Sequence, residues 1–134
     1  MDHIELISSS IGVPLAYVVR AAEDPQQTTF VTPDEANLQV GFVVYPAGGE
    51  IARHEHRPIE RTIRGTSEVL VVRSGCCELD VYDDARALVA TRELRQGDVM
   101  VMVGGGHGFR LTEDTVLLEV KQGPYTGPDE KERF

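Results

Sequence analysis

The chain has 134 residues, which is enough for one domain with a substantial core. Hydrophobic residues make up 41% and charged residues 26%, and the net charge of −9 disfavours nucleic acid and anionic membranes as partners. The first six residues lack the pattern of a signal peptide, and no apolar run is long enough for a transmembrane helix. These features favour a cytoplasmic location.

Short apolar runs separated by turn residues predict an all-β protein and no amphipathic helix. Two short turns, Ser74-Gly75 and Asp83-Asp84, are suited to closing hairpins, and a glycine turn at 46–49 precedes a histidine-containing segment. The expected strands are residues 16–20, 28–31, 38–45, 50–56, 68–73, 76–82, 88–94, 98–103, 108–111 and 115–122. The polar tail at 128–134 is expected to be a short helical turn or loose.

The two cysteines, Cys76 and Cys77, are adjacent in one expected strand. Neighbouring residues of a strand point to opposite faces, so a disulfide between them would be strained. We expect one cysteine in the core and one on the outer face, both reduced.

The chain has four histidines, of which His54 and His56 form an H-x-H pair and His107 follows a run of three glycines. Side chains at i and i+2 of a strand share a face about 7 Å apart, so His54 and His56 can approach one ion. Glu68 begins a later strand, and it adds a carboxylate. His54, His56, Glu68 and His107 suit one divalent transition metal such as Fe, Mn, Ni or Zn.

Glu60 competes with Glu68 for the carboxylate position. We favour Glu68, because a ligand is best held by a rigid strand. Glu60 lies among Arg57, Arg61 and Arg64, where an ion-pair network is the simpler interpretation.

These residues resemble the first motif of the cupin superfamily, G-x5-H-x-H-x3,4-E-x6-G, in which Gly48, Glu68 and Gly75 take the remaining positions. One departure is that eleven residues, 57–67, separate His56 from Glu68. The second motif, G-x5-P-x-G-x2-H-x3-N, is looser. Gly97, Gly104 and His107 fit it after one deletion, and Met102 and Leu111 replace its Pro and Asn.

The resemblance implies one cupin domain over residues 1–134, a double-stranded β-helix or jelly-roll barrel. Its core would span about 38–122, with N-terminal strands within 1–37 and a tail at 123–134. It also implies a metal at the open end of the barrel and a homodimer. Several segments look like a small single-domain cupin group found among saccharide biosynthesis proteins: 57–65, 97–100, 104–109 and 119–125.

Four further residues are candidates for contacts with a substrate. Arg57 and Arg64 could clamp an anionic group, although an exposed loop is the simpler interpretation. Lys121 shares a strand face with Glu119, pointing either into the barrel or to solvent. Tyr125 could act as a general acid beside Glu68, or it could pack on a partner subunit.

The sequence therefore predicts a metal-dependent enzyme of the isomerase, epimerase or oxygenase type. Its substrate would be a small polar molecule, possibly a sugar or sugar derivative. The alternative is a non-catalytic cupin that binds a saccharide or metabolite, with a structural metal or none. A third possibility is a structural subunit with the barrel as a dimerisation platform.

Overall fold

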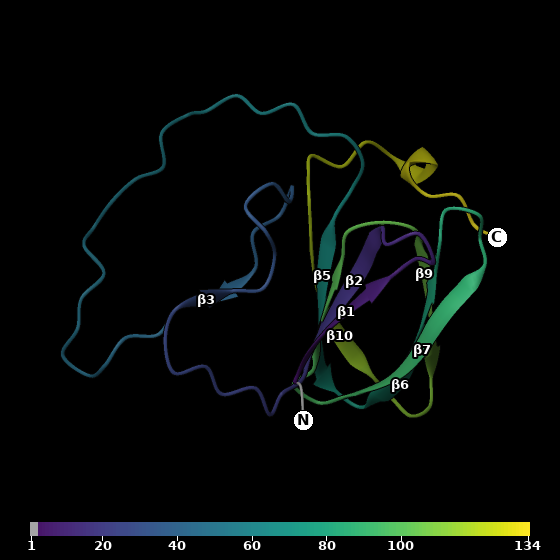
Figure 1. The fold of residues 1–134 in the computed structure, drawn as a ribbon, viewed down its shortest axis with the longest axis horizontal. Helices are drawn as coiled ribbons and strands as arrows, with labels where there is room; N and C mark the ends of the chain where they lie inside the picture. Colours follow the sequence, from purple (N-terminus) through teal and green to yellow (C-terminus); the bar gives the residue numbers. More distant parts are fainter. Residues whose placement is uncertain (1–2) are drawn as a thin grey trace.

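The computed structural model describes residues 3–134 and is all-β, with antiparallel pairing in every sheet. A five-stranded sheet has the order β1-β2-β8-β5-β10, and a three-stranded sheet has the order β7-β6-β9. The strand bounds are β1 (Ile4–Ser8), β2 (Pro14–Val19), β5 (Glu68–Ser74), β6 (Cys76–Tyr82), β7 (Leu88–Arg95), β8 (Val99–Met102), β9 (Gly106–Leu111) and β10 (Val116–Lys121). The two sheets face each other as a sandwich (Figure 1).

The core lies between the two sheets. Leu70, Val72 and Met100 come from the five-stranded sheet, and Leu79 and Val81 come from the three-stranded sheet. The burial of β5 alternates along the strand, as period-two side chains require for a strand with one face in a core. Apolar burial between the sheets is therefore the main stabilising contribution to this fold.

Gly75 closes the hairpin between β5 and β6 with a φ of +92°. A Cβ atom there would also collide with the backbone of Asp114. Only glycine satisfies both conditions, so the tight turn expected at Ser74-Gly75 is explained.

The cysteine prediction is confirmed in part, because the cysteine expected on the outer face, Cys76, is buried as well. Cys76 and Cys77 are both free and buried, and only Cys77 belongs to the core cluster between the sheets. Burial raises the pKa of the Cys77 thiol, which keeps it protonated and unreactive.

Most of the expected strands are present, with three corrections. The expected strand at 50–56 is absent, and the strands expected at 28–31 and 38–45 shrink to β3 (Thr29–Phe30) and β4 (Gly41–Phe42), which pair only with each other. An additional strand, β1, lies in the N-terminal region where no specific range was expected. A strand requires a neighbouring edge for its hydrogen bonds, and residues 43–66 have none among the described residues.

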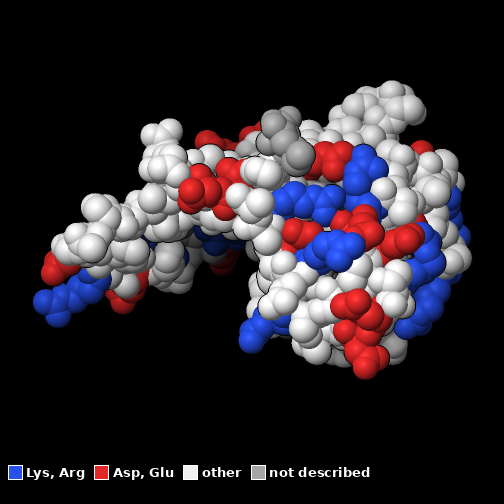
Figure 2. All heavy atoms as spheres, turned by 90° about the horizontal axis from the view of Figure 1, so that it is seen from below, with Lys and Arg blue, Asp and Glu red and all other residues white. Residues whose placement is uncertain are grey.

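Residues 43–66, which we call the arm, project from the sandwich on the side of the five-stranded sheet (Figures 1 and 2). Every residue from 45 to 66 is exposed. The arm leaves the sandwich through the β3–β4 hairpin and returns at β5. The expected closed barrel is therefore wrong for this chain: the sandwich is open along β9 and β10, each of which is the last strand of its sheet.

The C-terminal tail ends beside the start of β9. It contains a single helical turn, η1 (Pro128–Glu130), as expected for this segment. Within residues 3–134, no helix is long and apolar enough to cross a membrane.

Candidate metal centre

Glu68 and His107 lie side by side at one end of the sandwich. Glu68 is the first residue of β5, and its Oε1 atom is 2.6 Å from Nε2 of His107 in β9. The Glu68 side chain is 10% exposed and that of His107 is 29% exposed. Two of the four expected ligands, from different sheets, are thus brought together, and the paired carboxylate is Glu68 rather than Glu60.

The face on which these side chains lie follows from the strand registers. His107 is opposite Val81 of β6, and Lys121 of β10 is opposite Glu68. Val81 belongs to the core cluster, so His107 points to the inner side of the sandwich. Glu119 is opposite the buried Leu70, so it and Lys121 share the inner face of β10. The register thus places Glu119 and Lys121 on the inner side of β10, although their side chains are still 42% and 24% exposed.

The surroundings of Glu68 favour its ionised form. The hydrogen bond from His107 lowers the pKa of the Glu68 carboxyl more than partial burial raises it. The Glu119 side chain and the positive charge of Lys121 lower this pKa further. Lys121 Nζ also lies 3.8 Å from Oε2 of Glu119. An ionised carboxylate is the form that binds a cation.

His54 and His56 lie on the arm. Their rings are neighbours, with centroids 5.3 Å apart, as the i, i+2 spacing predicts. Nδ1 of His54 is 2.8 Å from the carbonyl oxygen of Ala52, and both residues are exposed. Among residues 3–134, His, Cys, Asp and Glu form no group of three or more that could hold a metal. The arm histidines are thus not joined to the Glu68–His107 pair.

The other candidate residues are spread along the arm and the tail. Arg57, Glu60, Arg61 and Arg64 are exposed on the arm, and within the described part of the chain none of them forms an ion pair. The ion-pair network expected around Glu60 is therefore absent there. Tyr125 is 72% exposed.

The chain's own terminus packs against the glycine run before His107. The Phe134 ring lies against Tyr82, with centroids 5.1 Å apart, and the guanidinium of Arg86 lies 4.9 Å from the Phe134 ring centroid. A Cβ atom on Gly106 would come within 2.8 Å of this ring. Sequence reasoning missed this contact. Its only signal in the sequence was the run of three glycines, Gly104–Gly106.

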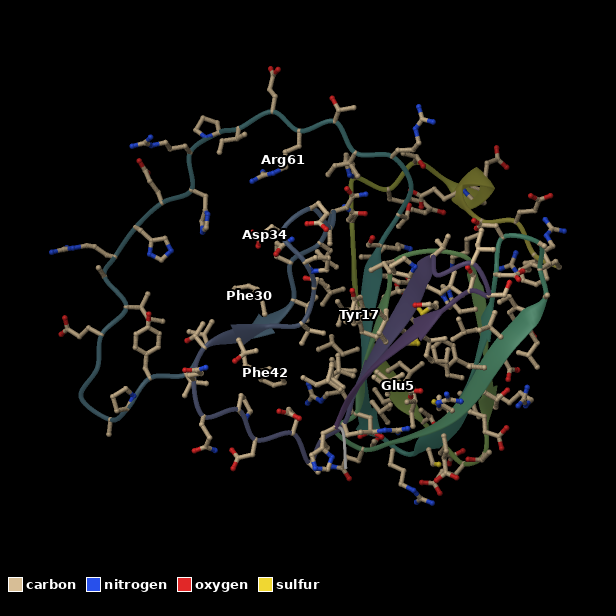
Figure 3. All side chains as sticks on the ribbon, in the orientation of Figure 1. Glu5, Tyr17, Phe30, Asp34, Phe42 and Arg61 are labelled. Carbon is tan, nitrogen blue, oxygen red and sulfur yellow. The ribbon has the colours of Figure 1, made fainter. Side chains whose placement is uncertain are left out.

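A hollow is lined by residues other than Glu68 and His107. Its lining includes the segment 34–39, Arg61 of the arm and Gln122 after β10, and Figure 3 shows Asp34 and Arg61 on either side of this region. None of the four candidate ligands lines it. We therefore place the candidate site at Glu68 and His107.

Comparisons of the chain with protein-family models, with curated proteins and with solved structures gave no match.

Proposed function

We propose that this chain is a metal-binding protein of the cupin type that catalyses a reaction on a small polar substrate. One divalent transition metal would be held by His54, His56, Glu68 and His107. The observation that carries the proposal is a group of charged and ionisable side chains on an inner face that is otherwise apolar: Glu68, His107, Glu119 and Lys121. Of these four residues Glu68 is buried, and buried charges in proteins are paired or bind metals.

The donor set fits a first-row divalent metal, because imidazole nitrogen and carboxylate oxygen are its ordinary ligands. A metal held there would polarise a substrate oxygen or bind O2, which covers isomerase, epimerase and oxygenase reactions alike. The His107 side chain is 29% exposed at one end of the sandwich, so a polar substrate can reach the pair from that end, and the remaining residues act on that substrate.

In this proposal, some side chains of the chain bind the polar substrate and others transfer protons. Glu68 is ionised, so it accepts a proton or holds the metal rather than donating a proton. Lys121 places a positive charge on the inner face, where it can bind a substrate oxygen. Arg57 and Arg64 can add to this binding, and Tyr125 can donate a phenolic proton, once the arm and the tail cover the site.

The test measures metal by elemental analysis after reconstitution with Fe, Mn, Ni and Zn in turn. We expect about one equivalent per chain, and a loss of at least tenfold in metal affinity in a His54→Ala, His56→Ala double variant and in Glu68→Gln. The matched control is an Arg53→Ala, Glu55→Ala double variant. It changes the two alternate, exposed positions of the same segment and should retain the metal.

Turnover is tested separately on the metal-loaded protein. A panel of aldoses, ketoses and sugar nucleotides is followed by NMR for deuterium uptake beside the carbonyl carbon, and O2 consumption is recorded. Metal absent from the wild type under every condition would overturn the proposal. A metal-loaded protein that is stabilised by a sugar but converts none of the panel would support the binding module instead.

A further inference from the structure

The open side of the sandwich has two unpaired sheet edges. β10 ends the five-stranded sheet, β9 ends the three-stranded sheet, and neither strand has a second neighbour within residues 3–134. Leu111 faces the inner side opposite Cys77 and is still 59% exposed. On the outer face of β10, Leu118 and Val120 are 46% and 51% exposed. Unpaired edges with exposed apolar side chains are sites for strand addition.

The arm supplies chain that is suited to fill these edges. Residues 41–45 and 50–56 have strand-forming patterns and flank the glycine turn at 46–49. Residues 50–56 are unpaired, and residues 41–42 pair with β3 on one edge only, so both segments have an edge free to pair with β9 and β10. Apolar side chains of the arm are exposed as well: Val43 58%, Tyr45 54%, Ile51 59%, Ile59 62% and Ile63 45%. Exposed apolar surface on both elements is the surface that association would remove from water.

Hydrogen bonds at the two ends of the arm hold it away from its own sandwich. β3 and β4 are paired, Val31 N donates to Val40 O at 2.7 Å, and Val44 N donates to the Thr28 hydroxyl at 3.0 Å. At the returning end, Asn37 Nδ2 donates to the carbonyl oxygen of Arg64 at 3.2 Å. Phe30 and Phe42 lie on this hairpin, and Arg61 lies on the arm (Figure 3). Folding the arm onto its own edges would require these contacts to be rearranged.

The charges also favour a second copy as the occupant. The arm carries four arginines and three glutamates, so its net charge is +1. Because the total net charge is −9, the rest of the chain has a net charge of −10. A weakly basic arm is attracted to an acidic sandwich of another copy, whereas two sandwiches repel each other.

We propose that two copies of this chain exchange arms. Residues 41–45 of each copy add to β10 of the other copy, and residues 50–56 add to β9. The strand that carries His54 and His56 then lies beside the strand that carries His107. On the basis of the function proposed above, each metal site is shared: two histidines come from one copy, and Glu68 and His107 come from the other.

Arm exchange is tested first without reference to metal, by sedimentation velocity of Ile51→Asp. This variant places a charge on an exposed arm residue that has no role in the sandwich of its own chain. We expect a wild-type dimer and a dimer dissociation constant raised about 30-fold or more in the variant. The matched control is Ile11→Asp in the β1–β2 turn, where the side chain is 85% exposed, and it should remain dimeric. The proposal would be overturned if the wild type stays monomeric at a protein concentration about 100 times the dissociation constant of an ordinary weak dimer.

Isotope-filtered NMR then shows which copy contributes the arm. Dimers are refolded from one copy with ¹³C-labelled methyl groups and one unlabelled copy. Contacts between Val43 of the arm and Leu118 or Val120 of β10 that cross between copies support the exchange. The same contacts found only within one copy would overturn it, whether or not metal is bound.

Complementation tests the shared site. A His54→Ala, His56→Ala copy is refolded with a Glu68→Gln, His107→Ala copy. Exchange predicts one intact site in each mixed dimer, so about half of the wild-type metal content returns in the isolated mixed dimer. Sites built within one copy would return none. Wild-type protein that binds no metal would remove the proposed function, and the NMR and sedimentation results would still decide the exchange.

Discussion

The sandwich is closed by its own residues on one side and left open on the other. Where β1 approaches β7, Arg92 donates two hydrogen bonds to the Glu5 carboxylate from Nε and Nη2, at 2.9 and 2.7 Å. Close to it, Arg20 Nη1 donates to the carbonyl oxygen of Glu93 at 2.6 Å and to Asp98 at 3.1 Å. Along β9 and β10, by contrast, apolar side chains such as Leu111 and Leu118 are exposed.

This difference supports the arm exchange proposed above. The closed side is held by side chains whose partners are all in the same chain, so its contribution to stability is independent of a second copy. The open side has unpaired edges and two of the four proposed ligands, and in the proposed exchange the arm of a second copy would complete both. One physical cause, the absence of a neighbouring strand, accounts for both features.

The largest expected effect concerns the core that both sides share. Leu79 is fully buried, and Leu79→Ala should lower the free energy of unfolding by about 2–5 kcal/mol, because it removes apolar contact and leaves a cavity. Urea denaturation at several protein concentrations measures it. Leu118→Ala is the matched variant on the open side. In dilute protein Leu118→Ala should lower the free energy of unfolding by less than about 1 kcal/mol, and this loss should grow at concentrations where dimers form. Equal costs for both variants at every concentration would contradict the comparison.

An intermediate effect is expected at the closed side. Asp98 is 6% exposed, and its carboxylate accepts hydrogen bonds from the backbone N–H groups of Ala21 and Arg95, each at 2.8 Å. Asp98→Ala leaves these donors and Arg20 without their acceptor, so the free energy of unfolding should fall by about 2–4 kcal/mol. Thermal and urea denaturation measure the loss.

The control for Asp98 is Asp84→Ala, an exposed aspartate in the β6–β7 turn. It should stay within about 0.5 kcal/mol of the wild type. Sedimentation of Asp98→Ala should still show the wild-type association. A dimer lost together with stability would mean that the two sides are coupled.

The strands of the sandwich could be predicted from the sequence, because their side chains alternate and their turns have ordinary chemistry. The range 76–82 is the observed β6, and the range 88–94 differs from β7 by one residue. The arm could not be predicted in this way. Residues 50–56 have the same kind of pattern as β6, but a pattern states a preference, and the partner edge decides whether a strand forms.

The candidate site follows the same division: the part on the strands could be predicted, and the part on the arm could not. Glu68 and His107 lie on strands of the sandwich, and the expected approach of these two side chains is observed. His54 and His56 have the expected mutual arrangement, but their distance from the other pair depends on where the arm lies. The packing of Phe134 on Tyr82 had no periodic signal, because it joins the end of the chain to a strand far away in sequence.

The smallest expected effect is the pH dependence of the Glu5–Arg92 pair on the closed side. The hydrogen bond from Arg92 lowers the Glu5 pKa below its ordinary value of 4.5 by more than partial burial raises it. A lowered pKa in the folded protein means that the pair stabilises the fold fully above pH 4.5. This contribution is lost as the pH falls through the folded pKa. Both side chains are more than one-third exposed, so it should amount to about 0.2–1 kcal/mol.

Glu5→Gln tests this pair by urea denaturation between neutral pH and pH 3. The variant should be less stable than the wild type at neutral pH, and the difference should shrink below pH 4.5, where the wild type also loses its carboxylate charge. Glu113→Gln, in the exposed turn before β10, is the control and should follow the wild-type curve. A difference that persists unchanged in acid would show that Glu5 contributes by packing rather than by charge. The closed side would then be held by apolar contact, as we infer for the open side once a second arm is in place.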